Sequence, residues 1–408
     1  MARERIVIVG ASLCGSHAAE TLRDEGFDGD IVLVGAEAHL PYDRPPLSKA
    51  FLQAPSDEQP DDPLYNPESF YTDHRIELHL GRRVLAVDAA RGTLTLAGGS
   101  PLTYDRLLLA TGSRVRRLNV PGADLPGVLY LRTLDDAHRL REAIGRARRA
   151  VVVGAGFIGA EVAASCHARG LEVTVLEAAT APLIRALGEE VGLLLADVHR
   201  QHGVDLRLGE AVAAFRGTGK VEQVVTASGR AIDADLVLVG VGVDAETGYL
   251  SGSGIAVDNG VTVDALCRST VPNVFAAGDC ANWPHRPTGR RLRVEHWDNA
   301  WNQAEAAARS MLGKGAPYDP VLYFWSDQYE IEIQYLGHAA QWDAVVLRGD
   351  LAVGSFAAFY LDGGTLRAAM CIGCPEGETD AIRTLLAQDA HPDPEALRDP
   401  DTDLASLV

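Results

Sequence analysis

A strand-like run followed by three regularly spaced glycines places the strongest constraint on the fold. The run Ala150–Val153 precedes Gly154, Gly156 and Gly159, and a helical segment follows. The first glycine permits a tight turn, the second lets the backbone approach a diphosphate, and the third lets the helix pack on the strand. With a strand before it and a helix after it, this G-x-G-x-x-G pattern predicts a dinucleotide-binding βαβ unit.

Glu177 indicates which dinucleotide this unit takes. It closes the next strand-like run, "LEVTVLE", and is followed by Ala178, Ala179 and Thr180, with no Arg or Lys. A carboxylate at this position hydrogen-bonds a ribose 2′-hydroxyl and repels a 2′-phosphate. We therefore expect NADH rather than NADPH.

The same order of elements occurs nearer the N-terminus. The run "RIVIV" leads into "GASLCG", a helical stretch from about Gly15 to Arg23, and the strand-like "DIVLVGAE". Ser12 replaces the middle glycine, but it is small, and its hydroxyl can donate to a diphosphate. Glu37 is the candidate ribose-binding carboxylate. The alternative is a nucleotide-free unit in which Gly10 and Gly15 serve only packing.

Composition limits the remaining classes of function. A chain of 408 residues with 47% hydrophobic residues can form two or three domains, each with its own hydrophobic core. No apolar run approaches the ~20 residues of a membrane helix, and the N-terminus has no signal-peptide pattern. We expect a cytoplasmic protein without membrane contact. A net charge of −19 disfavours nucleic-acid binding.

The six cysteines fall into two groups. Four lie far apart in apolar or glycine-rich settings and are predicted to be buried and unreactive: Cys14, Cys166, Cys267 and Cys280. Cys371 and Cys374 form a C-x-x-C motif, which occurs in redox and metal sites. Zinc needs a second ligand pair, and none with suitable spacing is nearby. We expect no metal and leave a redox role of this pair open.

The order of elements predicts an α/β fold with two Rossmann-like, glutathione-reductase-type dinucleotide-binding domains and an α+β C-terminal domain. The run "NVFAAGDCA" is interpreted as the last strand of the first unit, so that the second unit is an insertion. The predicted domains are 1–117 with 240–316, 118–239, and 317–408.

Other segments carry weaker expectations. The Pro- and Asp-rich segment Pro41–Pro67 predicts a long loop leaving the first unit. Helices are expected over Glu295–Met311 and Glu376–Gln388. The last twenty or so residues are rich in Pro and Asp and predict a loosely held tail.

Several motifs in sequence order resemble one family. They are "PYDRPPLSK", "LLLATGSRVR", "YLRTLDDA", "VVVGAGFIGAEVA", "NVFAAGDCANW", "EHWDNAWNQA" and "FWSDQYEIEIQYLG". Together they span nearly the whole chain and are similar to the NADH-dependent ferredoxin reductases of bacterial oxygenase and cytochrome P450 systems. These are putidaredoxin reductase-like members of the FAD-dependent pyridine nucleotide oxidoreductases. The resemblance implies FAD in the first unit, NADH in the second, and a C-terminal domain that covers the flavin.

The resemblance also implies an activity, that of a ferredoxin–NAD(+) reductase. Such an enzyme takes hydride from NADH and passes single electrons to a [2Fe–2S] ferredoxin that supplies a P450 or a Rieske oxygenase. Related disulfide reductases place cysteines just after the first unit, where this chain reads "HLPYDRPPLSKAFL". The alternatives are a reductase for rubredoxin or a quinone, and a redox-sensing flavoprotein of the apoptosis-inducing-factor type.

The family motifs assign residues to each site. Lys49 is expected near flavin N5 with Glu161 as its carboxylate partner, and these two are the predicted catalytic residues. The predicted FAD residues are Gly10, Ser12, Leu13, Cys14, Gly15, Glu37, Arg44, Lys49, Val84, Ala110, Thr111, Gly112, Arg132, Gly278, Asp279, Glu295, His296, Trp297 and Trp325. The predicted NAD residues are Gly154, Gly156, Phe157, Ile158, Gly159, Glu161, Glu177, Arg185, Gly240 and Gly242.

The chain departs from the family pattern at two positions. Many relatives carry an acid where this chain has Ala36, which puts the role of Glu37 in doubt. Relatives usually carry Ala where this chain has Cys14.

An acidic ferredoxin would need a basic patch in order to dock on so acidic a protein. The candidates are Arg290, Arg291 and Arg293, and a second run of Arg114, Arg116 and Arg117. A monomer and a homodimer are both compatible with the sequence.

Overall fold

The computed structural model describes residues 3–55, 58 and 60–408. The chain forms two compact units, each assembled from separate stretches of sequence. Unit 1 comprises Met1–Asp43, Asp62–Arg114 and Asp244–Tyr323. Unit 2 comprises Arg44–Asp61, Val115–Val243 and Phe324–Val408.

Unit 1 is built on a parallel five-stranded sheet with the order β19-β7-β1-β2-β3. Its strands are β1 (Arg5–Val9), β2 (Asp30–Val34), β3 (Ile76–His79), β7 (Arg106–Leu109) and β19 (Val274–Ala276). Because β19 pairs with β7, the predicted last strand of the first unit is confirmed. Near-continuous apolar strands of this kind need both sheet faces covered.

Two helices cover one face of this sheet, α1 (Leu13–Asp24) and α7 (Trp297–Met311). Alternate residues of the strands, such as Ile6 and Ile8, join their core, while Val7 and Val9 face a second core on the other side. That second face is covered by small antiparallel and mixed sheets. Their strands are β4 (Val84–Asp88), β5 (Thr93–Leu96), β6 (Leu102–Thr103), β18 (Val261–Thr262), β20 (Ala281–His285) and β21 (Arg290–Leu292).

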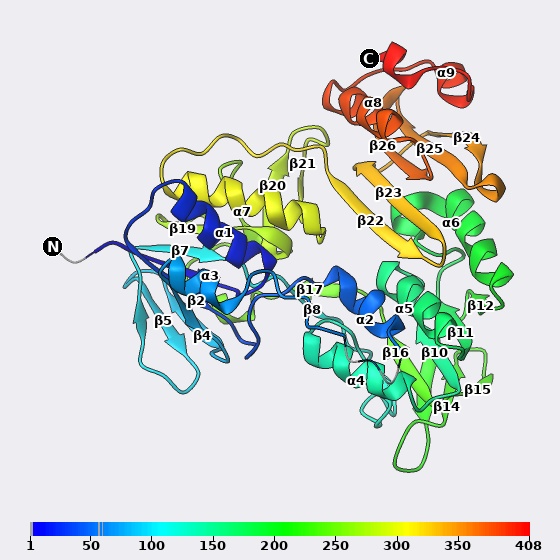
Figure 1. Cartoon of the computed structure of the whole chain (residues 1–408), viewed down its shortest axis with the longest axis horizontal. Helices are drawn as coiled ribbons and strands as arrows, with labels where there is room; N and C mark the ends of the chain where they lie inside the picture. Colours follow the sequence, from blue (N-terminus) through cyan, green and yellow to red (C-terminus); the bar gives the residue numbers. More distant parts are fainter. Residues whose placement is uncertain (1–2, 56–57, 59) are drawn as a thin grey trace. The chain divides into compact units, whose positions relative to one another are not determined.

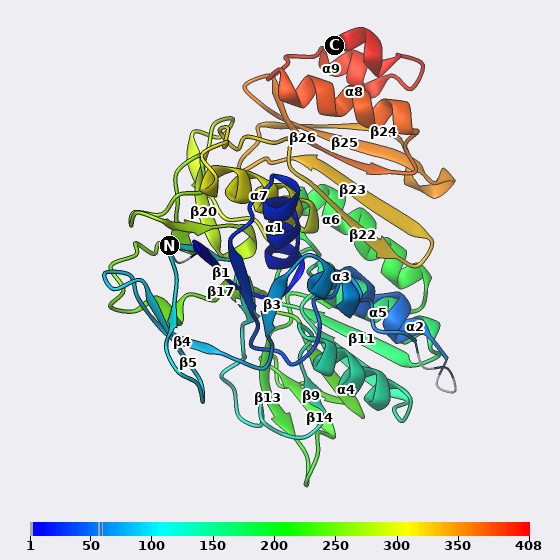
Figure 2. The ribbon, with the colours of Figure 1, turned by 60° about the vertical axis from the view of Figure 1, so that its left-hand side comes forward.

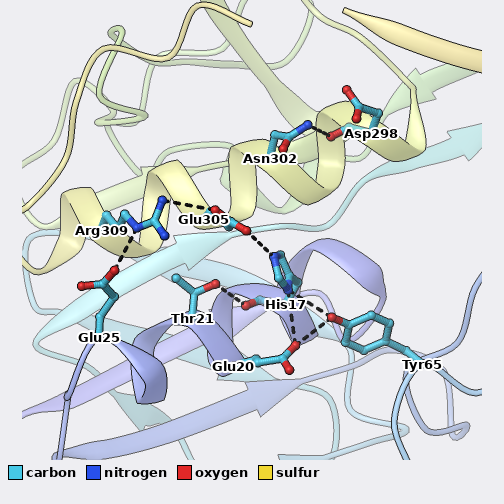
Figure 3. A network of polar contacts seen from close by, with 9 residues as sticks. All are labelled: His17, Glu20, Thr21, Glu25, Tyr65, Asp298, Asn302, Glu305 and Arg309. Atoms are coloured by element: carbon cyan, nitrogen blue, oxygen red, sulfur yellow. Dashed lines mark hydrogen bonds and ion pairs between the residues drawn. The ribbon is translucent and has the colours of Figure 1, made fainter. Parts of the chain in front are cut away.

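Helices α1 and α7 are joined by a polar network as well as by apolar packing (Figure 3). His17 of α1 lies between Tyr65, whose hydroxyl is 3.0 Å from Nδ1, and Glu305 of α7, whose Oε1 is 3.2 Å from Nε2. Farther along, Arg309 of α7 donates to Glu25 at 2.9 Å. The His17 ring also stacks on Trp301, with 3.7 Å between ring centroids. These contacts hold α7 in place on α1.

The remaining unit 1 elements connect these parts. They are α3 (Glu68–Asp73) and the 3₁₀ turns η2 (Gly248–Leu250) and η3 (Gly278–Cys280). Strands β8 (Ser113–Val115) and β17 (Val243–Ala245) lie where the chain passes between the units.

Unit 2 contains a second parallel sheet, with the order β12-β11-β10-β16-β9. Its strands are β9 (Val128–Leu129), β10 (Arg149–Val153), β11 (Glu172–Glu177), β12 (Asp205–Leu208) and β16 (Leu236–Val239). The associated helices are η1 (Pro45–Ser48), α2 (Ala50–Gln53), α4 (Leu134–Ile144), α5 (Phe157–Ala168) and α6 (Ile184–Gln201). A small antiparallel sheet joins β13 (Val212–Arg216), β14 (Gln223–Thr226) and β15 (Ala231–Asp233).

The C-terminal part of unit 2 is an antiparallel sheet with the order β22-β23-β26-β25-β24 (Figures 1 and 2). Its strands are β22 (Tyr323–Gln328), β23 (Ile331–Gly337), β24 (Ala344–Asp350), β25 (Ser355–Asp362) and β26 (Thr365–Ile372). One face packs on α6 through a shared apolar core that includes Leu187, Tyr335 and Met370. Helix α8 (Glu376–Ala387) contacts β23 and β26 and buries Ile382 and Leu385.

The predicted α/β fold class is confirmed, and the division into three domains stays a prediction. The predicted helices are present with shifted ends: α1 begins at Leu13 rather than Gly15, and α7 begins at Trp297 rather than Glu295. The prediction of a long loop over Pro41–Pro67 is wrong in part, because this segment contains η1 and α2. Residues 56, 57 and 59 of that segment lie outside the described residues.

The prediction of a loosely held tail is wrong. The tail forms α9 (Pro394–Arg398) and the 3₁₀ turn η5 (Leu404–Leu407), and it buries Leu397 and Leu404. Arg348, itself buried, donates to the backbone carbonyls of Pro400 at 3.1 Å and Thr402 at 2.9 Å. The Pro- and Asp-rich composition therefore supplies helix caps and turns rather than disorder: Asp393 caps α9 and Asp403 caps η5.

Among residues 3–55, 58 and 60–408, no helix has both the length and the apolar character needed to cross a membrane.

Candidate functional site: two glycine turns and a buried lysine–glutamate pair

The first glycine turn connects β1 to α1 and is crowded at its two ends. Gly10 has φ +121°, and a Cβ there would lie 2.0 Å from the carbonyl oxygen of Ala110. A Cβ on Gly15 would lie 1.9 Å from the carbonyl oxygen of Gly10. The end positions of this turn therefore accept only glycine. Ser12 is the N-cap residue of α1, and its side chain makes no capping hydrogen bond.

The second turn, between β10 and α5, repeats this geometry. Gly154 has φ +98°, and a Cβ on Gly159 would lie 2.0 Å from the Gly154 carbonyl oxygen. At the middle position the situation differs, since a Cβ on Gly156 would meet nothing within 4 Å. Gly156 is the N-cap of α5. An open space beside a helix N-terminus suits a diphosphate, because the first backbone N–H groups and the helix dipole favour an anion.

This comparison explains how the first turn keeps its shape with a serine in the middle. The end glycines are demanded by the protein's own backbone, and the middle position faces open space in the intact turn. A serine side chain is therefore compatible with the fold, and it would border the space that a diphosphate would take. The residues of both turns fit such a ligand.

The two candidate ribose carboxylates have different local partners. Glu177, at the end of β11, accepts the backbone N–H of Ala155 at 2.6 Å and of Ala179 at 2.8 Å. These bonds hold it beside the second glycine turn. Glu37 accepts the hydroxyl hydrogen of Tyr42 at 2.7 Å. The ribose-binding roles of Glu177 and Glu37 stay predictions.

Lys49 and Glu161 form the ion pair expected from the sequence. The Lys49 ammonium lies 3.0 Å from Glu161 Oε2, and their side chains are 15% and 3% exposed. Lys49 directly follows η1, and Glu161 lies in the second turn of α5. A carboxylate this buried would be costly without a cation, and the reverse holds for the lysine. The pair is confirmed, and its catalytic role stays a prediction.

Sequence reasoning missed two further partners of Glu161. Ser48 donates to Oε2, and Ser326 of β22 donates to Oε1 at 2.7 Å. Gln328 donates to Ser326 at 3.2 Å, and all three polar residues are buried. Ser48 stands next to Lys49 in "PPLSK", and Ser326 stands next to Trp325 in "FWSDQY". The available signal was adjacency in sequence, since each missed serine stands next to a predicted residue. Side chains alternate along β22, so Ser326 and Trp325 lie on opposite faces of the strand.

Within unit 1, Asp279 and Trp297 are held by local contacts. Asp279 Oδ2 accepts the hydroxyl hydrogen of Ser113 at 2.8 Å. The indole nitrogen of Trp297 donates to Asp43 at 2.9 Å, and its ring stacks on Trp301. Both side chains therefore have defined orientations.

Cys14 carries no charge that would oppose an anion at the first turn. Its thiol is buried, and burial together with nearby Cys280 and Asp279 raises its pKa well above the usual range. All four isolated cysteines are free, and they are buried as predicted.

The three arginines of the first candidate docking run differ in what they contact. Arg291 donates to the carbonyls of Val263 and Asn282. Arg293 has a side chain only 9% exposed, pairs with Glu295 at 2.6 Å and donates to the Asp279 carbonyl. Arg290 lies exposed on β21. Arg291 and Arg293 are therefore engaged in internal structure.

The predicted cofactor residues are divided between the two units. Unit 1 holds Gly10, Ser12, Leu13, Cys14, Gly15, Glu37, Val84, Ala110, Thr111, Gly112, Gly278, Asp279, Glu295, His296 and Trp297. Unit 2 holds Arg44, Lys49, Arg132 and Trp325, together with all of the predicted NAD residues. Their assignment to cofactors stays a prediction.

Comparison with known proteins identifies the family. Residues 4–304 match the model for pyridine nucleotide-disulphide oxidoreductases, and residues 323–408 match the reductase C-terminal model. The chain is 40% identical to rhodocoxin reductase of Rhodococcus erythropolis, over 99% of this chain and 94% of that protein.

Two further comparisons agree. The chain is 38% identical to the biphenyl dioxygenase system ferredoxin–NAD(+) reductase component of Paraburkholderia xenovorans (strain LB400), over 99% and 98% of the two chains. It matches the crystal structure of the covalent putidaredoxin reductase–putidaredoxin complex with a TM-score of 0.94 and 34% identity, covering 100% and 98%. Family membership implies binding of FAD and a nicotinamide dinucleotide, for which the two glycine turns are suited. The chain therefore belongs to the pyridine nucleotide-disulphide oxidoreductases, in the branch of the ferredoxin reductases of oxygenase systems.

Proposed function

We propose that this protein is an NADH-dependent ferredoxin reductase that holds FAD at the Gly10 turn and NADH at the Gly154 turn. When bound, the flavin accepts a hydride from the nicotinamide and releases its electrons one at a time. The observation that carries the proposal is the pair of glycine turns, whose end positions are closed by the protein's own backbone while the middle of the second is open.

The preference for NADH rests on Glu177. Its carboxylate is held beside the second turn by two backbone N–H groups, and no basic side chain follows it in sequence before Pro182. An anion fixed at that position accepts hydrogen bonds from a ribose diol and repels a 2′-phosphate.

The buried Lys49–Glu161 pair would stabilise negative charge at the reacting centre. Glu161 accepts hydrogen bonds from Ser48 and Ser326, which fix its carboxylate beside the Lys49 ammonium. A cation fixed in this way stabilises negative charge that develops near it. Lys49 is the proposed catalytic residue, and Glu161 positions it.

The proposed electron acceptor is a [2Fe–2S] ferredoxin, which would supply a P450 or a Rieske oxygenase. The structural neighbour at a TM-score of 0.94 is itself joined to putidaredoxin. Within the run Arg290, Arg291 and Arg293, we propose Arg290 as the docking residue, because Arg291 and Arg293 are engaged in internal contacts.

The test is stopped-flow reduction of the FAD-loaded protein by NADH and by NADPH, followed by mixing with separate acceptors. We expect bleaching of the visible flavin absorption by NADH and fast reoxidation by a [2Fe–2S] ferredoxin, with slower reoxidation by rubredoxin or a small quinone. In Glu177→Ala the preference for NADH over NADPH should shrink by about tenfold, as expected for loss of one charge-assisted hydrogen bond.

Three results would contradict the proposal. They are a protein that shows no flavin absorption after FAD is supplied, equal rates with all acceptors, and an unchanged nucleotide preference in Glu177→Ala.

A further inference from the structure

The C-x-x-C motif lies at the junction of β26 and α8, and neither the fold nor the proposed function uses its thiols. Cys371 is the second-last residue of β26, and Cys374 immediately precedes Pro375, the N-cap of α8. Both cysteines are free. Met370 and Ile372 join the core shared with α6, so alternation along the strand directs Cys371 to the opposite face, where α8 packs.

The turn between the two cysteines brings their thiols together. Gly373 has φ +61°, and a Cβ there would lie 1.9 Å from the carbonyl oxygen of Gly354. Only glycine therefore allows the chain to reverse at this point. The Cys371 and Cys374 thiols lie close enough across this turn for each to change the pKa of the other. Cys371 is 1% exposed and Cys374 is partly exposed.

The surroundings make the two thiols unequal. The hydrogen bond to Cys374, together with burial, raises the pKa of Cys371. The same hydrogen bond lowers the pKa of Cys374, and the Arg348 guanidinium adds to this effect. Burial and the Glu378 carboxylate oppose it; Glu378 is itself paired with Arg348 at 2.9 Å. In its protonated form the Cys374 thiol donates to the Phe356 carbonyl oxygen at 3.5 Å.

The other cysteines provide an internal contrast. Cys14, Cys166, Cys267 and Cys280 are all buried. Burial raises the pKa of each thiol, to about 12 for Cys166 and for Cys267. Thiolate character and access together determine which cysteine reacts. Among the six cysteines, Cys374 combines partial exposure with a neighbouring thiol, that of Cys371.

On the described part of the chain, no group of three or more His, Cys, Asp and Glu side chains could hold a metal ion.

We propose that Cys371 and Cys374 are a dithiol–disulfide couple that exchanges with low-molecular-weight disulfides. The Cys374 thiolate attacks one sulfur of the small disulfide, forming a mixed disulfide at Cys374 and releasing one small thiol. The Cys371 sulfur, after losing its proton, then attacks the Cys374 sulfur and displaces the second small thiol. The two cysteines are oxidised by two electrons, and the small disulfide is reduced to two thiols.

The experiment uses the full chain and glutathione as the probe. The protein is equilibrated with buffers of increasing oxidised-to-reduced glutathione ratio, quenched with acid and alkylated, and the peptide containing Cys371 and Cys374 is identified by mass spectrometry. We expect an intramolecular disulfide in the parent. Cys371→Ser should trap glutathione on Cys374, and Cys374→Ser should leave Cys371 reduced. The matched control Cys166→Ser should behave as the parent does.

A second measurement needs no variant and so does not depend on whether the substitutions fold. In the parent protein, Cys374 should be alkylated by iodoacetamide at least about tenfold faster than the four buried cysteines, because the thiolate is the reacting form. Two results would overturn the proposal. One is a pair of free thiols in the parent at every glutathione ratio, and the other is alkylation of Cys374 no faster than that of Cys166.

Discussion

Glu161 shows how a single buried residue dictates its surroundings. A carboxylate that is 3% exposed cannot rely on water, and the fold supplies one ammonium and two hydroxyl groups instead. Glu161 lies in α5, and these partners come from two other segments of unit 2: η1 with the residue after it, and β22. Removing one donor from such a site leaves part of a buried charge without a partner.

Ser326→Ala is therefore expected to lower the free energy of unfolding by about 1.5–3 kcal/mol, the range for a hydrogen bond to a charged group. The measurement is urea unfolding monitored by circular dichroism. The exposed Ser100 provides the control, since Ser100→Ala should change the free energy of unfolding by less than about 0.5 kcal/mol. Equal effects of the two substitutions would mean that the Ser326 hydroxyl does not stabilise Glu161.

At the scale of elements, the turn between β10 and α5 has different glycines for folding and for ligand binding. The end glycine of this turn is in contact with the protein's own backbone, while the middle glycine borders open space. Substitutions at these two positions should consequently have different effects.

Gly156→Val should leave the fold intact, because a Cβ at this position meets nothing within 4 Å, and should weaken NADH binding by about tenfold or more by filling the space beside the helix N-terminus. Gly159→Ala should instead prevent folding, since its Cβ would lie 2.0 Å from the Gly154 carbonyl oxygen. Circular dichroism and NADH titration distinguish the two outcomes. Unchanged NADH affinity in a folded Gly156→Val protein would place the nucleotide elsewhere.

A second element-scale feature joins the C-terminal turn of α6 to the turn between β22 and β23. His199 Nδ1 lies 2.8 Å from the Tyr329 hydroxyl, and the ring of His202 stacks on the same tyrosine. Burial lowers the pKa of His199 from 6.5 to about 4. The unfolded chain therefore binds a proton at a higher pH than the native protein does, and stability falls as the pH drops through this window.

Between pH 7 and pH 4, His199 should reduce the free energy of unfolding by about 3 kcal/mol, from a pKa difference of about 2.5 units. His199→Gln should flatten this part of the pH profile, as measured by urea unfolding at successive pH values. The exposed His391 is the control, because His391→Gln should retain the parent's slope. A steep slope that survives in His199→Gln would assign the pH dependence to other groups.

At the scale of the whole molecule, a net charge of −19 opposes association with any acidic protein. A local cation can still steer such a partner, and its influence should fade as salt screens it.

Arg290→Glu should slow association with an acidic [2Fe–2S] ferredoxin about three- to tenfold at low ionic strength, with the difference disappearing at high salt. The exposed Arg216 is the control, because Arg216→Glu changes the net charge by the same amount on a different unit. Stopped-flow kinetics at several salt concentrations provide the measurement. Equal slowing by both substitutions would mean that total charge, rather than Arg290, controls docking.

The sequence by itself determined the features that depend on neighbours along the chain. Apolar runs, glycine spacing and helical patterns were enough for the two parallel sheets, for both glycine turns and for the assignment of β19 to the first sheet. The Lys49–Glu161 pair was also predicted, although through the family motifs rather than through spacing.

Only the tertiary structure decided which distant residues complete these features. In the folded chain Ser326 donates to Glu161, and Arg291 and Arg293 make internal contacts. Arg348 holds the C-terminal tail, although the composition of that tail is typical of a disordered segment. The physical reason is common to all of these cases. A hydrogen bond or ion pair between residues far apart in sequence leaves no local pattern, because its donor and acceptor meet only after the sheets and helices have packed.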